Sequence, residues 1–281
     1  MLNNRENFTF WKFDKKIFKS EDYKLNNRIA KINSKKSFSD ICKRYTHITS
    51  KNMEKVLKIE SRISKNIKGV GVDLGGGIGL MSSIIAKRKK LKKIYCVDIV
   101  KNAVIYCQPI IKKKVLGNKS YKVSSVIGSF DQLNLNNESV DFCIAWDAMH
   151  HSLNIIKTLK EANRVLKKGG KFIIIDRGHN NETSDNEIKR MRNVVYSKAF
   201  LKENYLPLNK KLTRKMNGEH EYRFYEWENF FKKTKFKILK KLIVKESSLK
   251  NIKNKQKITE KKVKFKIGGF ERKKIIFLLQ K

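Results

Sequence analysis

The sequence predicts an α/β fold with a doubly wound, mostly parallel sheet and helices on both faces. Short apolar runs of strand length alternate along the chain with segments of helical composition, which is the pattern of an α/β protein. One run leads directly into a glycine-rich turn and then a helix, at 68–86. Another, at 142–145, is continuously apolar, as expected of a strand that is buried on both faces of a sheet.

The glycine-rich turn predicts a ligand site. The segment 68–80 reads K-G-V-G-V-D-L-G-G-G-I-G-L, a strand and a turn, and 80–86 has helical composition. Glycine permits positive φ and lets a ligand approach the bare backbone, and the start of a helix offers unpaired N–H groups. The spacing is not the G-x-G-x-x-G of dinucleotide-binding proteins, because Leu80 stands where the last glycine would be. A glycine-rich turn of some other α/β protein is the alternative.

The remaining elements are predicted from apolar runs and helical periodicity. The apolar residues at 50–63 recur with a helical period, which predicts a helix there. A second helix, with one apolar stripe, runs from 155 to 166, and it is followed by lysines and by Gly169. Pro109 should kink or end the first half of the helix that begins at 101. Further helices are expected at 187–205 and 222–231, and further strands at 93–98, 121–126, 140–145, 171–176, 235–244 and 272–279.

Two motifs resemble those of class I S-adenosylmethionine-dependent methyltransferases. The turn contains D-x-G-x-G-x-G from Asp73 to Gly79, which is similar to the first motif of that family. The unit L-K-K-G-G-K-F-I-I-I-D at 166–176 is similar to the family's L-K-P-G-G motif, with Lys168 in place of the proline. The resemblance covers roughly residues 50–281. It implies a Rossmann-like sheet of seven strands, one of them antiparallel, and S-adenosylmethionine as the cofactor.

The resemblance also implies which residues bind the cofactor. The turn would be shaped by Gly75, Gly76, Gly77 and Gly79, with Asp73 beside it. Asp98 ends a strand and matches the family's second motif, so it would bind the ribose hydroxyls, since a carboxylate offers two oxygens to two adjacent hydroxyls. An exposed aspartate at a strand end is the alternative.

The adenine contact departs from the family's pattern. Where the family commonly has G-D-A-x-x-L, this chain has Gly128, then Ser129 and Phe130 in place of the acid and the alanine, and Asp131 after them. Ser129 or Asp131 would accept a hydrogen bond, and the ring of Phe130 would lie against the adenine face. The predicted cofactor contacts are completed by Ile99, Ala145 and Trp146.

The segment W-D-A-M-H-H at 146–151 follows the fourth predicted strand. Ligands of open α/β sheets bind at the carboxyl ends of the strands, and the resemblance implies that an apolar-His-His turn here faces the reacting centre. His151 or His150 is the predicted general base or substrate-orienting group, with Asp147 as a third candidate. The alternative for each histidine is a structural role, one packed on the helix and the other facing solvent.

The net charge of +40 admits two interpretations. It can serve a nucleic-acid or anionic-membrane partner, or it can be compositional, because the excess is mostly lysine dispersed along the whole chain. Nucleic-acid enzymes of the family that methylate amino groups carry an N-P-P-Y-like turn where this chain has A-W-D-A. The predicted acceptor is therefore a small molecule, a sugar or another metabolite. An RNA or DNA methyltransferase and a non-catalytic cofactor-binding subunit are the alternatives.

The domain organisation predicted is an aromatic and basic cover segment at 1–49 and a methyltransferase domain at 50–281, whose insertion around 178–225 builds the acceptor pocket. The first residues lack the apolar core of a signal peptide, and no apolar run reaches the ~20 residues that span a bilayer. A cytoplasmic location is expected. The cysteines and histidines lack the spacing of metal ligands, so no metal is expected.

Overall fold

The computed structural model describes residues 8–41, 57, 61–244, 266–267, 270–271 and 273–281. The predicted helical period at 50–63 therefore lies mostly outside the described residues, as does nearly all of the lysine-rich stretch at 246–266. None of the helices in the described residues is long and apolar enough to cross a membrane.

Eight strands form one sheet in the order β1-β4-β3-β2-β5-β6-β10-β7. The first six pair in parallel, and β10 is antiparallel to both of its neighbours. The strands are β1 (Phe8–Phe10), β2 (Gly69–Leu74), β3 (Leu91–Asp98), β4 (Val123–Ile127), β5 (Val140–Trp146), β6 (Leu166–Gly178), β7 (Lys237–Val244) and β10 (Lys273–Gln280). The predicted class of a doubly wound, mostly parallel sheet is confirmed.

The sheet has one strand more than the seven expected. The additional strand is β1, which pairs in parallel with β4 through the register Phe8↔Ser125 and Phe10↔Ile127. Its three residues belong to the aromatic cluster of the N-terminal segment, and a run so short carries no alternation that would mark it as a strand. Residues 8–10 of the N-terminal segment are thus part of the sheet.

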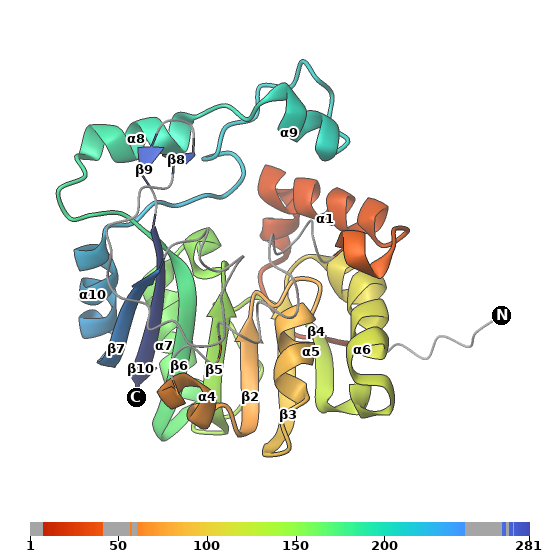
Figure 1. Ribbon diagram of the computed structural model, residues 1–281, viewed down its shortest axis with the longest axis vertical. Helices are drawn as coiled ribbons and strands as arrows, with labels where there is room; N and C mark the ends of the chain where they lie inside the picture. The colour runs from red at the N-terminus through yellow and green to blue at the C-terminus, as the bar shows by residue number, and fades with distance from the viewer. Residues whose placement is uncertain (1–7, 42–56, 58–60, 245–265, 268–269, 272) are drawn as a thin grey trace.

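Helices lie on both faces of the sheet (Figure 1). One face is covered by α4 (Ser61–Asn66), α5 (Leu80–Ala86) and α6 (Gln108–Leu116), and its apolar core includes Ile63, Ile84 and Ile111. The other face is covered by α7 (Ile155–Val165) and α10 (Phe224–Lys233), with Leu159 and Trp227 in its core. Because both faces are covered, the central strands are buried on both sides, which is why they are almost uniformly apolar.

Two local predictions meet different outcomes. Pro109 stands in the first turn of α6, directly after the π-helix η2 (Ala103–Cys107), so the helix is interrupted where the proline predicts it. The expected helix end at 167–170 is wrong, because α7 ends at Val165 and Leu166 already pairs with Val140. Residues 167–170 form a bulge in β6, since the next pairing joins Lys171 to Phe142, and Gly169 supplies its positive φ of 73°.

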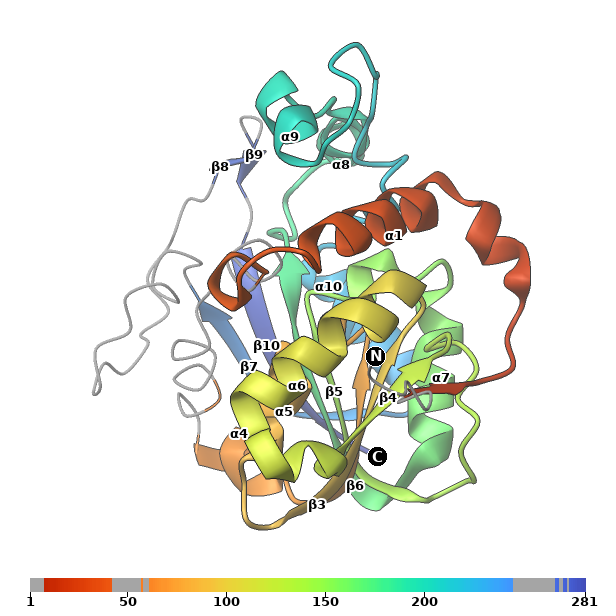
Figure 2. The same ribbon diagram turned by 90° about the vertical axis from the view of Figure 1, so that its right-hand side faces the viewer.

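Two segments lie above the carboxyl ends of the parallel strands (Figures 1 and 2). One is α1 (Glu21–Asn33), which comes from the N-terminal region. The other is residues 178–223, with α8 (Asp185–Asn193) and α9 (Lys198–Glu203), which we call the cap. The single helix expected at 187–205 is therefore two, because the chain is extended at Val194 and Ser197 caps a new helix start. The short strands β8 (Lys266–Ile267) and β9 (Phe270–Glu271) pair only with each other.

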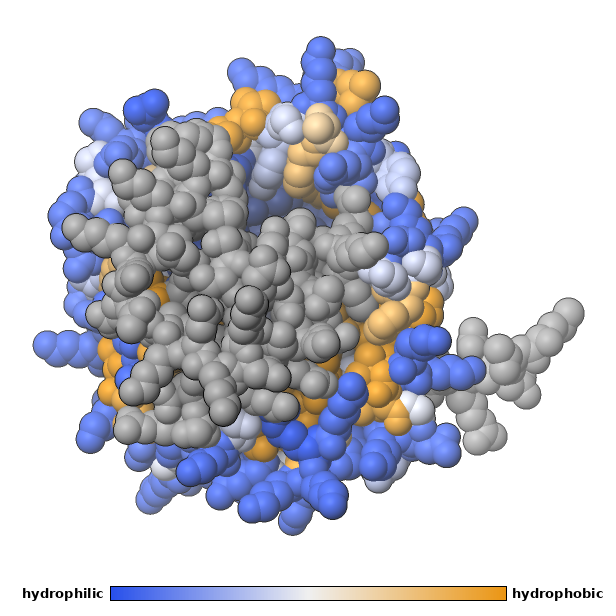
Figure 3. Space-filling model, in the orientation of Figure 1, coloured by the Kyte–Doolittle hydropathy of each residue, from blue (hydrophilic) through white to orange (hydrophobic). Residues whose placement is uncertain are grey.

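Hydrophilic residues surround the face of the molecule that Figure 3 shows, with apolar colour confined to smaller areas between them. In the sequence, the lysines are dispersed along the whole chain.

Candidate cofactor and acceptor site

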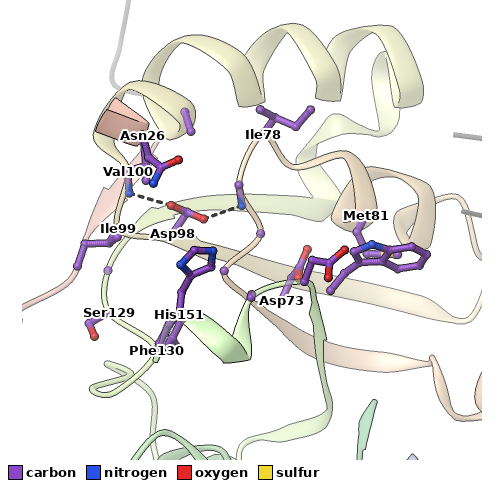
Figure 4. A pocket seen from close by; sticks show the side chains of 18 of the residues that line it. Asn26, Asp73, Ile78, Met81, Asp98, Ile99, Val100, Ser129, Phe130 and His151 are labelled. Atoms are coloured by element: carbon purple, nitrogen blue, oxygen red, sulfur yellow. Dashed lines mark hydrogen bonds between the residues drawn. The ribbon is translucent and has the colours of Figure 1, made fainter. Parts of the chain in front are cut away.

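A cavity of about 240 Å³ opens at the carboxyl ends of β2, β3, β4 and β5. The order of the sheet reverses between β2 and β5, and ligands of open α/β sheets bind at such a reversal. The turns after these four strands supply most of the wall, and α1 contributes Asp22 and Asn26 from above. Figure 4 shows the side chains that line it.

The glycine turn presents bare backbone to this cavity. Gly75 and Gly77 both have positive φ, 72° and 53°, which only glycine adopts readily. A Cβ added to Gly77 would meet no atom within 4 Å, so the space beside its backbone is open. At Gly76 a Cβ would lie 2.4 Å from Cys96 Sγ, so glycine is required there by the close approach of β3. The turn is therefore shaped to receive a ligand against its main chain.

Gly79 has a different position from the other glycines of the motif. It caps the start of α5 with a φ of 78° and does not line the cavity. A Cβ there would lie 3.2 Å from the side chain of Gln108. Its place in the motif is explained by the turn into the helix rather than by contact with the cavity.

Asp98 lies at the end of β3, directly opposite the glycine turn. One carboxylate oxygen accepts a hydrogen bond from the backbone N–H of Gly77 at 2.7 Å, and the other accepts one from Val100 at 2.8 Å (Figure 4). Burial raises the pKa of Asp98, and these two backbone donors act in the opposite direction. Each carboxylate oxygen has a second lone pair, so the held carboxylate can still accept from a pair of hydroxyls.

Asp73 lies near the end of β2, beside the same turn, and it is almost completely buried, with 1% of its surface exposed. Its carboxylate accepts a hydrogen bond from the hydroxyl of Ser82 in α5 at 2.7 Å. Burial raises the pKa of Asp73 to about 7, and Asp98 nearby adds to the effect. The carboxyl group therefore changes its charge near neutral pH.

The three predicted adenine contacts line one wall of the cavity, together with Ile99: Ser129, Phe130 and Asp131. Asp131 accepts a hydrogen bond from the hydroxyl of Thr158, and its own N–H donates to Ser129 Oγ at 3.1 Å. Trp146 also lines the cavity. Ala145 does not, because it is fully buried in the core behind the sheet edge.

The structure separates the two predicted histidines. His151 lines the cavity, and its ring is drawn in the centre of the view, beside Asp98 (Figure 4). His150 is buried behind it, with 2% of its surface exposed, and its ring nitrogen Nδ1 is hydrogen-bonded to Asp176 Oδ1 at 2.6 Å. Burial lowers the pKa of His150 well below its ordinary value, and Arg177 lowers it further. His150 is thus a buried side chain that the structure does not bring to the cavity wall.

A buried network of charges joins the cap to the ends of β6. Glu219 of the cap forms ion pairs with Arg177 and with Arg214, and Glu221 forms an ion pair with Arg214 and a hydrogen bond of 2.7 Å with His179 Nε2. Burial alone would raise the pKa of Glu219, but Arg177 beside it lowers that pKa far below its usual range. The pair of Glu219 with Arg177 joins the cap to β6, and the other pairs of this network lie within the cap.

Asp147 follows β5 in a left-handed backbone conformation, with a φ of 49°. Such a conformation is strained for a residue other than glycine and often marks a functional turn. Burial would raise the pKa of Asp147, but Lys274 of β10, His150 and Arg177 together lower it below its ordinary value. Asp147 therefore faces the cavity as a carboxylate whose charge is already compensated.

Two groups of described side chains bring imidazole and carboxylate atoms within 4.8 Å of one another: His150, His151 and Glu219, and Asp147, His150 and Asp176. In the first group Glu219 is already paired with arginines, and in the second Asp147 is paired with Lys274. These cations supply the positive charge that a metal ion would otherwise supply.

Two polar side chains of the cavity wall, Asp22 and Asn26, were not predicted from the sequence. Both lie on α1, and Asn26 Nδ2 donates to Asp22 Oδ1 at 2.6 Å. The only sequence signal was the capping pattern at Ser20, whose hydroxyl accepts from the N–H of Tyr23 and fixes the start of the helix. That signal predicts a helix but not the place to which it is brought.

Comparisons with known proteins agree with this geometry. The family model of the methyltransferase domain matches residues 72–174, which contain the glycine turn, Asp98 and the paired histidines. A curated relative, sarcosine/dimethylglycine N-methyltransferase of Aphanothece halophytica, is 32% identical over 121 residues. That match spans 41% of this chain and 42% of the relative.

Solved structures share the fold at low identity. The [4+2]-cyclase SpnF is 13% identical with a TM-score of 0.56, over 83% of this chain and 80% of that chain. The mitomycin 7-O-methyltransferase MmcR is 10% identical with a TM-score of 0.51, over 83% of this chain and 54% of that chain. These proteins differ in the reactions their names state, so likeness of fold leaves the acceptor open. Together with the motifs and the sheet order, the match shows that residues 72–174 are similar to the methyltransferase domain family.

Proposed function

We propose that this chain transfers a methyl group from S-adenosylmethionine to a small-molecule acceptor. The observation that carries the proposal is the open space beside the backbone of Gly77, facing a carboxylate that the same residue's N–H holds in place. An extended ligand with a vicinal diol fits this pairing, because its chain can lie against the glycine backbone while its two hydroxyls donate to Asp98.

The lining of the cavity supports the other contacts within this proposal. Ile99, Ser129 and Phe130 would hold the adenine, by apolar contact and by the hydroxyl of Ser129. The turn from Gly75 to Gly77 would hold the amino-acid end, with Asp73 behind it. Trp146 and Met81 complete an apolar wall beside that turn.

When bound, S-adenosylmethionine supplies a methyl group that is already activated on a positively charged sulfur. The chain then has to orient the acceptor and exclude water, and positioning of reactants alone can contribute ~7–11 kcal/mol in the best cases. Here α1 and the cap lie over the strand ends, and the ion pair of Glu219 with Arg177 joins the cap to β6. His151 is the cavity residue whose imidazole can accept a proton from an acceptor.

A small acceptor is favoured by the same coverage. The site lies beneath α1, whose side chains form part of its wall, so a polymer would have to displace this helix to reach it. The curated relative is named for methylation of small amines. Both observations favour a metabolite over nucleic acid.

The proposal is tested by following S-adenosylhomocysteine by mass spectrometry, after bound nucleic acid has been removed from the purified protein with high salt. The protein is incubated with S-adenosylmethionine and separate pools of small amines, small hydroxyl compounds, tRNA and duplex DNA. We expect product with a small-molecule pool and none above background with either nucleic acid. Turnover only with tRNA or DNA would contradict the proposed acceptor class, and failure to bind S-adenosylmethionine at all would contradict the proposed activity.

A further inference from the structure

The charge of the cavity wall is opposite to the charge of the chain. The chain has 66 lysines and arginines against 26 aspartates and glutamates. Among the described residues that line the cavity there are five aspartates and no lysine or arginine. An acidic wall in so basic a protein favours a positively charged ligand, since a cleft lined by one sign of charge attracts the opposite sign.

Four of the five carboxylates are engaged by the fold or by the proposed cofactor contacts. Asp98 is held by two backbone N–H groups at the glycine turn. Asp73 and Asp131 accept from the hydroxyls of Ser82 and Thr158, and Asp147 is paired with Lys274. Asp22 is the fifth carboxylate. None of these partners contacts it, so its place in the cavity wall needs another explanation.

Asp22 is fixed in place but not neutralised. The amide of Asn26 donates to its Oδ1, and no lysine or arginine among the described residues forms an ion pair with it. Burial raises the pKa of Asp22, and the nearest charged groups that act on it are His151 and Glu219. A carboxylate held this way at the mouth of a cavity is available to a cationic ligand.

His151 meets Asp22 from the opposite side. A Cβ added to Gly218 of the cap would lie 2.7 Å from Asp22 Oδ2 and 3.3 Å from His151 Nδ1, so both atoms are close to one point. His151 Nδ1 is buried and has no hydrogen-bond partner among the described residues. Three segments far apart in the sequence thus place a carboxylate and an unpaired imidazole nitrogen together at the cavity.

We propose that Asp22 and His151 bind the methyl acceptor as an amine, with Asp22 holding its positive charge and His151 receiving its proton. This inference rests on the proposed function and names its acceptor class. Glycine is required at position 218 beside the pair, because a Cβ there would lie only 2.7 Å from Asp22 Oδ2.

The chemistry of the transfer uses both residues. An ammonium acceptor first gives a proton to the imidazole of His151, which frees the lone pair on the acceptor nitrogen. That lone pair forms the N–CH₃ bond while the CH₃–S bond breaks, and the bonding pair remains on the sulfur, which becomes neutral. The positive charge passes from sulfur to nitrogen, and the carboxylate of Asp22 stabilises it there in the transition state.

The inference is tested with two cofactor analogues that differ in one charge at the transferred methyl. S-adenosylhomocysteine has a neutral sulfur there, and sinefungin has a carbon that carries an ammonium group. Their dissociation constants are measured by calorimetry for the wild type, Asp22→Asn and Asp14→Asn. Asp14 is exposed, lies in the same N-terminal region outside the cavity, and controls for the change in net charge.

We expect Asp22→Asn to weaken sinefungin binding at least about tenfold, the loss of one close charge pair, and to change S-adenosylhomocysteine binding by less than about twofold. Asp14→Asn should change neither. An unchanged ratio of the two affinities in Asp22→Asn would overturn the inference while leaving the proposed function intact. Failure of the wild type to bind S-adenosylhomocysteine would instead overturn the proposed function.

A turnover measurement separates positioning from general damage to the fold. His151→Gln keeps a polar side chain but cannot take up the proton, so amine methylation should become steeply dependent on pH and recover at alkaline pH, where the acceptor is already neutral. Asp22→Glu, which keeps the charge, should retain more activity than Asp22→Asn. Equal activity of wild type and both Asp22 variants with amine acceptors would contradict the inference.

Discussion

Asp98→Asn is expected to weaken the binding of S-adenosylhomocysteine by about 100-fold. The change removes the charge and replaces one acceptor oxygen with an amide group that can only donate. Hydrogen bonds to a charged group contribute ~1.5–3 kcal/mol each; one ribose hydroxyl would lose its acceptor, and the other would keep only a neutral one. The new amide would also face the N–H of Gly77 or Val100, both of which now donate to the carboxylate. Calorimetric titration measures the effect.

Asp141→Asn is the matched control for this variant. Asp141 also accepts from a backbone N–H, that of Val70 at 2.7 Å, and it pairs with Lys167. It lies at the opposite, amino end of β5 and does not line the cavity. We expect cofactor affinity within about twofold of the wild type for Asp141→Asn. Equal affinities for Asp98→Asn and Asp141→Asn would remove Asp98 from the site.

Asp73→Asn is expected to stabilise the ligand-free protein at alkaline pH by roughly 2–4 kcal/mol. The pKa of Asp73 is raised from 3.8 to about 7 by burial, so the folded state keeps a proton that the unfolded state releases. Between these two values the folded state binds more protons, and stability therefore falls as pH rises. Below pH 3.8 the protonated Asp73 makes its full contribution to the stability of the folded state, and above pH 7 this contribution is lost.

The asparagine mimics the protonated carboxyl group at every pH. Its stabilising effect should therefore be largest above pH 7 and shrink as the pH falls toward 4, which chemical denaturation at several pH values measures. Asp14→Asn, at an exposed position, should show no such dependence. A destabilising effect of Asp73→Asn at pH 8 would show that the ionised carboxylate is supported by interactions other than its bond to Ser82.

Sequence patterns predicted the central fold because its signals are local. Strands buried on both faces are short apolar runs, and β5 follows this pattern from Phe142 to Trp146. The antiparallel strand at the end of the chain, β10, agrees within one or two residues with the range expected. The failures have equally local reasons: β1 is too short to show a period, and the bulge at 167–170 has the same residues as a helix end.

The candidate site was predictable where residues follow a strand directly. The carboxyl ends of parallel strands meet at one edge, so the glycine turn, Asp98, Ser129 and Trp146 come together as expected. Their roles in binding stay predictions. Asp22 could not be found in this way, because its position depends on how α1 is folded back over the sheet, a long-range arrangement that no local pattern encodes.

The sequence also could not predict which of the two histidines faces the cavity. Neighbouring residues in a short helical turn point in different directions, and here one faces the cavity while the other faces Asp176. Which of them does so depends on the partner that β6 supplies. The sequence shows both side chains as equivalent candidates.

A pair of glycine variants tests whether the glycine turn receives the cofactor against its bare backbone. Gly77 and Gly169 both have positive φ, 53° and 73°, and a Cβ would meet no atom within 4 Å at either position. Alanine thus imposes a similar backbone strain at both, of roughly 1 kcal/mol, but only Gly77 lines the cavity.

The measurement is calorimetric titration of S-adenosylhomocysteine into the wild type, Gly77→Ala and Gly169→Ala. We predict micromolar binding by the wild type and by Gly169→Ala, and a loss of affinity of at least about tenfold in Gly77→Ala, because the methyl group takes the space of the ligand. Equal binding by all three proteins would show that the cofactor does not lie against the backbone of Gly77. Absence of binding by the wild type would contradict the assignment of the cofactor.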